Sequence, residues 1–349
     1  MRYVNYSDSE RIKHLRPVLI FLVLLIHAER AFRGYADSTP PQPIMQYIII
    51  FFRGNLCRIA VPFFFIISGY LFCLKLPEIT DKKWYLILMK KKFFRLVLPY
   101  VFCNLYLIVL VMFFTRIPGI SGRMEPTIEN LRGGVFPFNE VPINFPLWFL
   151  RDLIFIFILS PILVIMLKEI PYFSLVLLGV IWMWHGKRHG LYAPEPFFWF
   201  YLGAVIKYKK IEVKISQKTF CVVSICYIII TSLLSYLTFI EYNLPYYKFI
   251  YNLNILLGII ILYYLSGTKF LQNGFVRHFT AASFFIYLFH EPVLSLTQYF
   301  LCEKFMFSSF ISQLVLFFGS AIFVFLIVDT LYGILFRIQW NRIKEKNNL

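Results

Sequence analysis

Long apolar runs alternate with short polar segments along the whole chain. Most runs hold roughly 18 to 25 residues, the length that a helix needs to cross a hydrocarbon core of about 30 Å. The runs at 170–185 and 195–208 are shorter and are separated by GKRHG and YAPEP, so these helices are expected to be tilted, broken or partly re-entrant. The pattern predicts about ten membrane spans. They lie at residues 15–33, 58–76, 94–115, 147–168, 170–185, 195–208, 219–240, 248–266, 281–301 and 311–336.

The composition agrees with this pattern. Of the 349 residues, 59% are hydrophobic and 20% aromatic, and only 15% are charged, against about 25% in ordinary globular domains. The first apolar run is not a signal peptide, because it leads into HAERAFRGY without a small-x-small cleavage site. We therefore predict an all-α polytopic membrane protein with a single transmembrane domain over residues 1–349.

Basic residues, which give the chain a net charge of +17, gather in the short segments on one side of the predicted spans. Cytoplasmic loops carry such an excess of Lys and Arg, so both termini, with the tail at 337–349, are expected to be cytoplasmic. Contacts with membrane lipid headgroups account for these charges, and we expect no nucleic-acid partner. The six cysteines are scattered without a CxxC pair and predict no metal site.

The longer connections, at 34–57 and 116–146, fall on the outer face and are rich in Pro, Gly and Asn. This composition predicts loops. Within the first of them, the apolar segment IMQYIIIFF is expected to form a short helix at the membrane interface.

His27 is the most unusual residue of the first span. It lies eleven positions after Arg16 at the cytoplasmic boundary, about 16 Å along a helix axis, which is roughly half of the hydrocarbon core. Ionisable groups at that depth are costly and face a cavity or a partner. A neutral imidazole can act as a general base near neutral pH, and a histidine that only hydrogen-bonds between helices is the alternative.

Two cations mark the start of the third span. Lys92 and Arg95 are three residues apart, so they share one helix face at the cytoplasmic boundary. Paired cations there can hold phosphates, and a positive-inside flank is the alternative.

The segment RIAVPFFFIISGYLF opens the second predicted span with Arg58 and carries Ser68, Gly69 and Tyr70 late in it. Small residues let helices approach closely, and this packing role is the simpler interpretation. The alternative is that Gly69, which has no side chain, admits a ligand.

Further polar residues stand at or within later spans. Trp148 suits an interfacial belt, and Arg151 and Asp152 are expected to be solvated close to that interface. His290 and Glu291 are mid-span, beside a proline that frees a carbonyl, and serve either in a site or as structural hydrogen-bonding groups. The remaining histidines, expected in loops or basic flanks, are His14, His185, His189 and His278.

Several short motifs occur in order along the chain. They are Arg16-x10-His27, RIAVPFFFIISGYL at 58–71, Lys92-x-x-Arg95, the W-F-L…P stretch at 148–161, FWFYLGAVI, and I-Y-x-x-H at 286–290. In this order they resemble the acyltransferase 3 family of bacterial membrane proteins, which typically has ten spans, and the resemblance covers essentially the whole chain. Two departures are Lys13-His14-Leu15, where the family often has an acidic residue, and Lys92, which stands where Arg is commoner and lacks bidentate geometry.

The resemblance implies an enzyme of the bacterial cytoplasmic (inner) membrane. Such an enzyme moves an acyl group, usually acetyl, from cytoplasmic acyl-CoA to a hydroxyl of an envelope glycan or lipid-linked sugar. Acetyl-CoA is then a donor substrate, and no permanently bound cofactor is implied. The phosphates would bind Arg16, Lys92 and Arg95, and His27 would deprotonate the acceptor, with an acyl-imidazole as the alternative. The expected substrate-contacting or supporting residues are Arg58, Ser68, Tyr70, Trp148, His290 and Glu291.

The orienting acid for His27 and the rival function stay open at this level. Glu29 is too near in sequence to face the same way on a regular helix, whereas Glu291 and Asp329 are candidates. A transporter that exports or flips a glycan intermediate is the rival class, although no repeated pair of interrupted helices relates the two halves. The sequence leaves homo-oligomerisation open.

Overall fold

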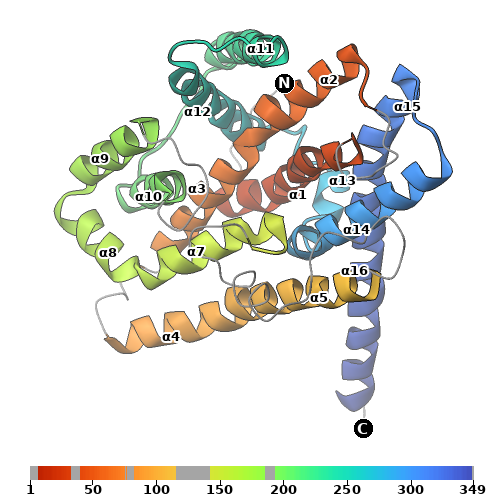
Figure 1. The fold of residues 1–349 in the computed structure, drawn as a ribbon. Coiled ribbons are helices and arrows are strands. Elements are labelled where there is room, and N and C mark those ends of the chain that lie inside the picture. The colour runs from red at the N-terminus through yellow and green to blue at the C-terminus, as the bar shows by residue number, and fades with distance from the viewer. Residues whose placement is uncertain are drawn as a thin grey trace. The chain divides into compact units, whose positions relative to one another are not determined.

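The computed structural model describes residues 7–32, 40–74, 76, 82–114, 142–184 and 193–347. All regular elements in these ranges are helices (Figure 1). The chain divides into two compact units. The first unit comprises Met1–Ala60, Lys218–Leu244 and Asn254–Leu349, and the second comprises Val61–Gln217 and Pro245–Leu253.

A helix occupies each range that the sequence predicts as a span. In chain order these helices are α1 (Asp8–His27), α3 (Ala60–Cys73), α5 (Leu98–Phe114), α7 (Trp148–Ile158) with α8 (Ser160–Glu169), α9 (Pro171–Trp184), α10 (Pro194–Tyr208), α11 (Gln217–Phe239), α12 (Tyr247–Ser266), α14 (Ser283–Lys304) and α16 (Ser320–Asn347). Shorter elements are η1 (Ala28–Phe32), α2 (Pro43–Ile49), η2 (Ile50–Asn55), η3 (Leu56–Ile59), α4 (Lys82–Lys92), η5 (Phe93–Val97), η6 (Phe145–Leu147), α13 (Gly274–His278), α15 (Phe310–Leu314) and η7 (Val315–Gly319).

Five helical runs among the described residues are long and apolar enough to cross a membrane, or six if α7 and α8, which are bent by 64°, form one broken span. These helices indicate a multi-pass membrane protein. The other predicted spans are helices that are shorter, such as α9, or that carry polar residues, such as α14 with His290, Glu291 and Gln298. The count of about ten spans and the cytoplasmic termini stay predictions.

Helix α1 begins earlier than the apolar run that predicted it. Ser7 caps the helix, its hydroxyl accepting from the Glu10 backbone while the Glu10 carboxylate accepts from the Ser7 backbone. This reciprocal capping box satisfies N–H groups that would otherwise be orphaned at the helix start. Arg11, which is buried, donates to the Tyr263 carbonyl oxygen at 2.6 Å and the Ser266 hydroxyl at 3.0 Å, so the polar first turns are anchored to α12 within the first unit.

Within the segment 34–57, residues 43–57 are helical, so the prediction of a loop was wrong there, whereas a helix is present at IMQYIIIFF as predicted. Residues Pro43 to Cys73 form one helical run of 31 residues, made of α2, the π-helix η2, the 3-10 helix η3 and α3 (Figure 1). IMQYIIIFF therefore belongs to this run rather than to a separate interfacial helix. The apolar residues before Gly54 favour a continuous helix, and the π-helical turn of η2 accommodates Gly54 and Asn55.

Glycines set the contact of α3 with α10 in the second unit. A Cβ added at Gly69 would collide with the Phe200 carbonyl oxygen, and one added at Gly203 would collide with the Ile66 carbonyl oxygen. The two helix backbones therefore approach closely at these residues, as small residues permit. At Gly69 the packing interpretation is confirmed, because the space beside this residue holds another helix.

Arg151 and Asp152 are buried, 2% and 3% exposed, so the prediction that they are solvated was wrong. The Arg151 guanidinium donates to the Asp152 carboxylate, with Nη2 2.8 Å from Oδ1. Burial of both charges is possible because each neutralises the other. The predicted tail at 337–349 continues α16 as far as Asn347, whereas His185, His189 and most of the 116–146 loop lie outside the described residues.

Candidate functional site

Two histidines that are distant in sequence meet in the first unit. His27 is the last residue of α1 and is 8% exposed, and His290 lies in α14 and is completely buried. Their ring centroids are 5.5 Å apart, with the ring planes inclined by 45°. Helices α1 and α14 pack against each other, and this contact brings the two imidazoles together.

The hydrogen bond of His290 assigns its tautomer. Its Nδ1 is 2.7 Å from the backbone carbonyl oxygen of Tyr287. A carbonyl oxygen only accepts, so Nδ1 carries the proton, and in the neutral ring Nε2 is the basic nitrogen. The next residue, Glu291, is also buried and accepts from the Ser295 hydroxyl at 3.1 Å. In the His27–His290 pair, the orientation of the His290 ring is thus fixed by its own helix, α14.

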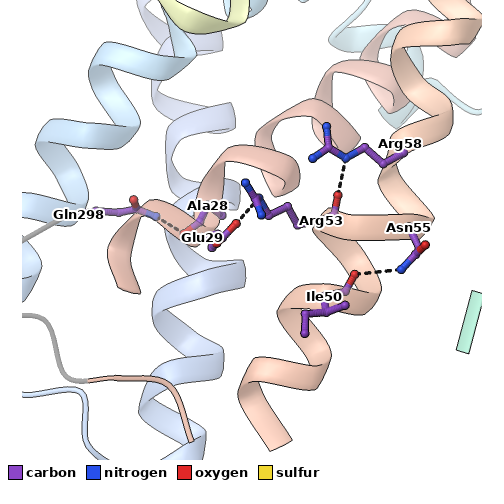
Figure 2. A network of polar contacts seen from close by, with 7 residues as sticks. All are labelled: Ala28, Glu29, Ile50, Arg53, Asn55, Arg58 and Gln298. Atoms are coloured by element: carbon purple, nitrogen blue, oxygen red, sulfur yellow. Dashed lines mark hydrogen bonds and ion pairs between the residues drawn. The ribbon is translucent and has the colours of Figure 1, made fainter. Parts of the chain in front are cut away.

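A glutamine holds the segment that follows His27. The side-chain Nε2 of Gln298 in α14 donates to the Ala28 carbonyl oxygen at 2.8 Å (Figure 2) and to the Ser320 hydroxyl of α16 at 3.0 Å. The carbonyls in the last turn of a helix lack intrahelical partners, and a side-chain donor such as this satisfies one of them. The residue that follows α1 is therefore hydrogen-bonded to α14, and the same glutamine links α14 to α16.

Glu29, in η1, forms an ion pair with Arg53 in the π-helix η2 (Figure 2). The Glu29 side chain is 5% exposed and the Arg53 side chain 37%. The backbone carbonyl of Arg53 in turn accepts from Nε of Arg58 at 2.8 Å. A buried carboxylate needs a nearby cation or hydrogen-bond donors, and the guanidinium of Arg53 supplies both to Glu29. The Glu29–Arg53 ion pair also connects the segment after α1 to the long helical run from Pro43 to Cys73.

Polar side chains continue from this network towards α11 and α12. Asn55 donates from Nδ2 to the Ser235 hydroxyl at 2.9 Å, and Ser235 donates to the Thr231 carbonyl oxygen at 2.7 Å. Asn254 donates to the Thr231 hydroxyl at 2.8 Å. All four side chains are buried, and their hydrogen bonds link η2 with α11 and α12 inside the first unit.

A family model described as an acyltransferase domain matches residues 9–332. The protein belongs to the acyltransferase 3 family. It is similar to the succinoglycan biosynthesis protein ExoH of Rhizobium meliloti (strain 1021), with 27% identity over 183 residues. That match covers 50% of this chain and 47% of ExoH, so the chain spans about half the length of this curated relative. No solved structure matches the chain.

Within this acyltransferase 3 chain, the acids considered for orienting His27 have different surroundings. Glu29 is engaged by Arg53. Asp329 in α16 has an oxygen 3.2 Å from Nε2 of the exposed His278. Glu291 directly follows His290 but is bonded to Ser295. The orienting role of Glu291 or Asp329 stays a prediction.

The predicted phosphate-binding cations come from separate elements of the acyltransferase 3 chain. Arg16 lies half-buried on α1 in the first unit. Lys92 ends α4 in the second unit, where its ammonium is 3.6 Å from the centroid of the Phe157 ring, and Arg95 in η5 is exposed. Their joint role in binding phosphates stays a prediction.

Three other predicted residues belong to the second unit. The Ser68 hydroxyl donates to the Phe64 carbonyl oxygen at 2.8 Å, within α3. The Tyr70 hydroxyl accepts from Lys207 Nζ at 3.2 Å, and Trp148 begins α7. Ser68 is therefore satisfied by its own helix, while Tyr70 faces a cation of α10.

Sequence reasoning missed Arg53 and Gln298. Arg53 lies in the segment that was predicted to be a loop. Gln298 lies in a predicted span, and no motif or charge marks it as a functional residue. The sequence held one signal for Arg53. Only a few residues separate IMQYIIIFF from the apolar run after Arg58, which favours one continuous helix with Arg53 inside it. Among the described residues, no three His, Cys, Asp or Glu side chains are grouped to hold a metal ion.

Proposed function

We propose that this protein is a membrane O-acyltransferase that moves an acyl group, most simply acetyl, from cytoplasmic acyl-CoA to a hydroxyl of a cell-envelope glycan. The observation that carries the proposal is the buried His27–His290 pair, next to the Glu29–Arg53 ion pair, in a chain of an acyltransferase family. The name of ExoH, a succinoglycan biosynthesis protein, supports a polysaccharide or its lipid-linked precursor as the acceptor.

His27 is the general base in this proposal. It removes the proton of the acceptor hydroxyl while the hydroxyl oxygen attacks the thioester carbon. A C–O bond forms and the carbonyl electron pair moves to the carbonyl oxygen. The tetrahedral adduct then collapses, the C–S bond breaks, and the CoA thiolate takes the proton from His27. The ester and free CoA are the products, and no further reactant is needed.

Burial of the histidine pair suits this chemistry. Imidazole is a base of suitable strength near neutral pH, and exclusion of water limits hydrolysis of the thioester. The donor is polyanionic and made in the cytosol, so Arg16, Lys92 and Arg95 at the predicted cytoplasmic boundary are the proposed phosphate ligands. We place the enzyme in the bacterial cytoplasmic membrane, with His27 between the donor on one side and the acceptor on the other.

Release of free CoA from acetyl-CoA by the purified protein, in the presence of envelope polysaccharide or its precursor, tests this function. Wild type should release CoA in proportion to ester formed, and His27→Ala should abolish release while the protein still inserts. His278→Ala is the matched control, because His278 is exposed and pairs with Asp329. Full activity of His27→Ala would exclude the general-base role.

Envelope glycans from a deletion strain separate this function from the rival class. An acyltransferase predicts loss of one acyl ester, measured by mass spectrometry, with the glycan still displayed. Retention of every ester together with loss of surface display would instead favour a transporter.

A further inference from the structure

Arg58 lies at the centre of a long apolar helical run. The run extends from Pro43 to Cys73 and has 31 residues, so fifteen precede Arg58 and fifteen follow it. At about 1.5 Å per residue, Arg58 is then roughly 22 Å from either end. The sequence alone placed this arginine at the outer boundary of a shorter span. A charged side chain far from both ends of an apolar run is costly and usually serves a site.

The backbone of the π-helix η2 orients the Arg58 guanidinium. Nε of Arg58 donates to the Arg53 carbonyl oxygen at 2.8 Å, which fixes the plane of the guanidinium and leaves Nη1 and Nη2 at its outer end (Figure 2). These two nitrogens are donors in a rigid fork that matches an oxygen anion. π-helical turns interrupt the regular backbone ladder and are frequent at functional sites.

The charges of this network do not balance. Figure 2 shows two guanidinium groups, those of Arg53 and Arg58, and one carboxylate, that of Glu29. Glu29 pairs with Arg53, and no carboxylate pairs with Arg58 in the part of the chain that the structure describes. One positive charge is therefore left over in a half-buried, largely apolar setting, where an anion would bind strongly.

The contacts of this network link Arg58 to the segment that directly follows His27. Glu29 is two residues after His27, and Arg53 connects Glu29 to Arg58 through its side chain and its carbonyl. Both guanidinium groups extend to the same side of the helical run in Figure 2. The element that holds Arg58, η3, also packs against α1, which ends in His27.

We infer that Arg58 binds the carbonyl oxygen of the donor thioester and stabilises the oxyanion that forms there. This inference rests on the proposed acyl transfer. When the acceptor oxygen attacks, the carbonyl electron pair moves to oxygen, and the Nη donors of Arg58 meet the new negative charge. Arg58 stays protonated throughout. The electron pair returns as the C–S bond breaks, and the CoA thiolate takes the proton that His27 holds.

The phosphates of the donor are a less suitable partner for Arg58. The proposed phosphate ligand Arg16 lies about 16 Å from His27 along α1, towards the cytoplasmic boundary. The network that contains Arg58 begins at Glu29, just beyond His27. The part of an acyl-CoA that reaches this depth is the thioester at the end of the pantetheine arm.

Binding of two unreactive CoA thioethers tests the inference without turnover. S-carboxymethyl-CoA carries a carboxylate beyond the sulfur, and S-ethyl-CoA is neutral there. Detergent-purified wild type should bind the carboxymethyl form about tenfold more tightly than the ethyl form. Arg58→Gln should lose this preference while its affinity for S-ethyl-CoA, which reports a folded donor site, is unchanged. Arg277→Gln, which alters an exposed arginine of α13, is the matched control.

Each outcome decides a separate point. An Arg58→Gln protein that keeps the wild-type preference overturns the inference and leaves the acyltransferase proposal standing. A wild-type protein that binds neither thioether overturns the acyl-CoA donor and the inference with it. In turnover, Arg58→Gln should lower kcat about 100-fold with little change in the KM for acetyl-CoA, because the oxyanion exists only in the transition state. A raised KM with normal kcat would instead assign Arg58 to phosphate binding.

Discussion

The carboxylate of Glu29 and the guanidinium of Arg53 form an ion pair that joins the end of α1 to the π-helix η2. Arg53→Gln would remove this cation from the buried Glu29, and loss of one partner of a fully buried pair costs about 3–5 kcal/mol. Because the Arg53 side chain is 37% exposed, we expect a smaller loss of unfolding free energy, about 1–3 kcal/mol. Thermal unfolding in detergent measures the effect.

The double variant Glu29→Gln/Arg53→Gln is the control for this prediction. It removes both charges, so it should be more stable than Arg53→Gln alone, and the double-mutant cycle should give a coupling energy. Additive losses would show that the two charges do not stabilise each other. CoA release should fall in Glu29→Gln, in Arg53→Gln and in the double variant, because Glu29 fixes the segment that directly follows His27.

Replacement of His290 separates the roles of its two ring nitrogens. His290→Asn keeps a donor near the position of Nδ1, which bonds the Tyr287 carbonyl oxygen, but removes Nε2. If His290 assists His27 through Nε2, this variant should unfold at nearly the wild-type temperature and yet lose at least about tenfold in kcat. His290→Gln, whose amide nitrogen lies near the position of Nε2, is the complementary variant. Equal kcat in wild type and His290→Asn would assign His290 to packing alone.

The contact between α3 and α10 predicts a strong effect of a single methyl group. Gly69→Ala would drive a Cβ into the Phe200 backbone carbonyl, which cannot move without shifting α10. Overpacking of this kind costs roughly 1–3 kcal/mol or more. The expected result is poor yield of folded protein, measured by size-exclusion chromatography and thermal unfolding.

Gly333→Ala is the matched control, because a Cβ at Gly333 would have no neighbour within 4 Å. It should be neutral or slightly stabilising, since Ala is favoured over Gly in a helix by about 0.8–1 kcal/mol. Equal behaviour of the two variants would contradict the close approach of α3 and α10.

The position of the helices could be predicted from the sequence because run length and apolarity are local properties. The runs at 219–240 and 248–266 correspond closely to α11 (Gln217–Phe239) and α12 (Tyr247–Ser266). The segment before Arg58 was misjudged, because Gly54 and Asn55 indicate a break, whereas in the structure the π turn of η2 carries the helix through them. That error also placed Arg58 at a boundary instead of at the centre of the run.

The site was predictable only in part, for a different reason. His27 and His290 each stood out as polar residues in apolar runs, but their proximity depends on how α1 and α14 pack. Glu29 was set aside on the assumption of a regular helix, and it proved to belong to the 3-10 turn η1, where Arg53 reaches it. Contacts between distant segments have no local signature, so Arg53 and Gln298 required the structure.

Lys92 and Arg95 should behave differently when each is removed, although both are proposed to bind donor phosphates. The Lys92 ammonium lies over the Phe157 ring, so Lys92→Ala also loses a cation–π contact of about 0.5–2 kcal/mol and should unfold at a lower temperature. Arg95 is exposed, so Arg95→Ala should keep wild-type stability.

In the kinetics, Arg95→Ala should raise the KM for acetyl-CoA about tenfold at unchanged kcat, because a phosphate contact is equally strong in the ground and transition states. Added salt should raise the wild-type KM and so reduce the difference in KM between wild type and Arg95→Ala. Exposed charges are screened over about 10 Å at 0.1 M ionic strength. Lys214→Ala, at an exposed lysine that pairs with Glu212, is the control for charge removal. An Arg95→Ala enzyme with the wild-type KM at low salt would remove Arg95 from the donor site, and the exposed charge would then be only a topology signal.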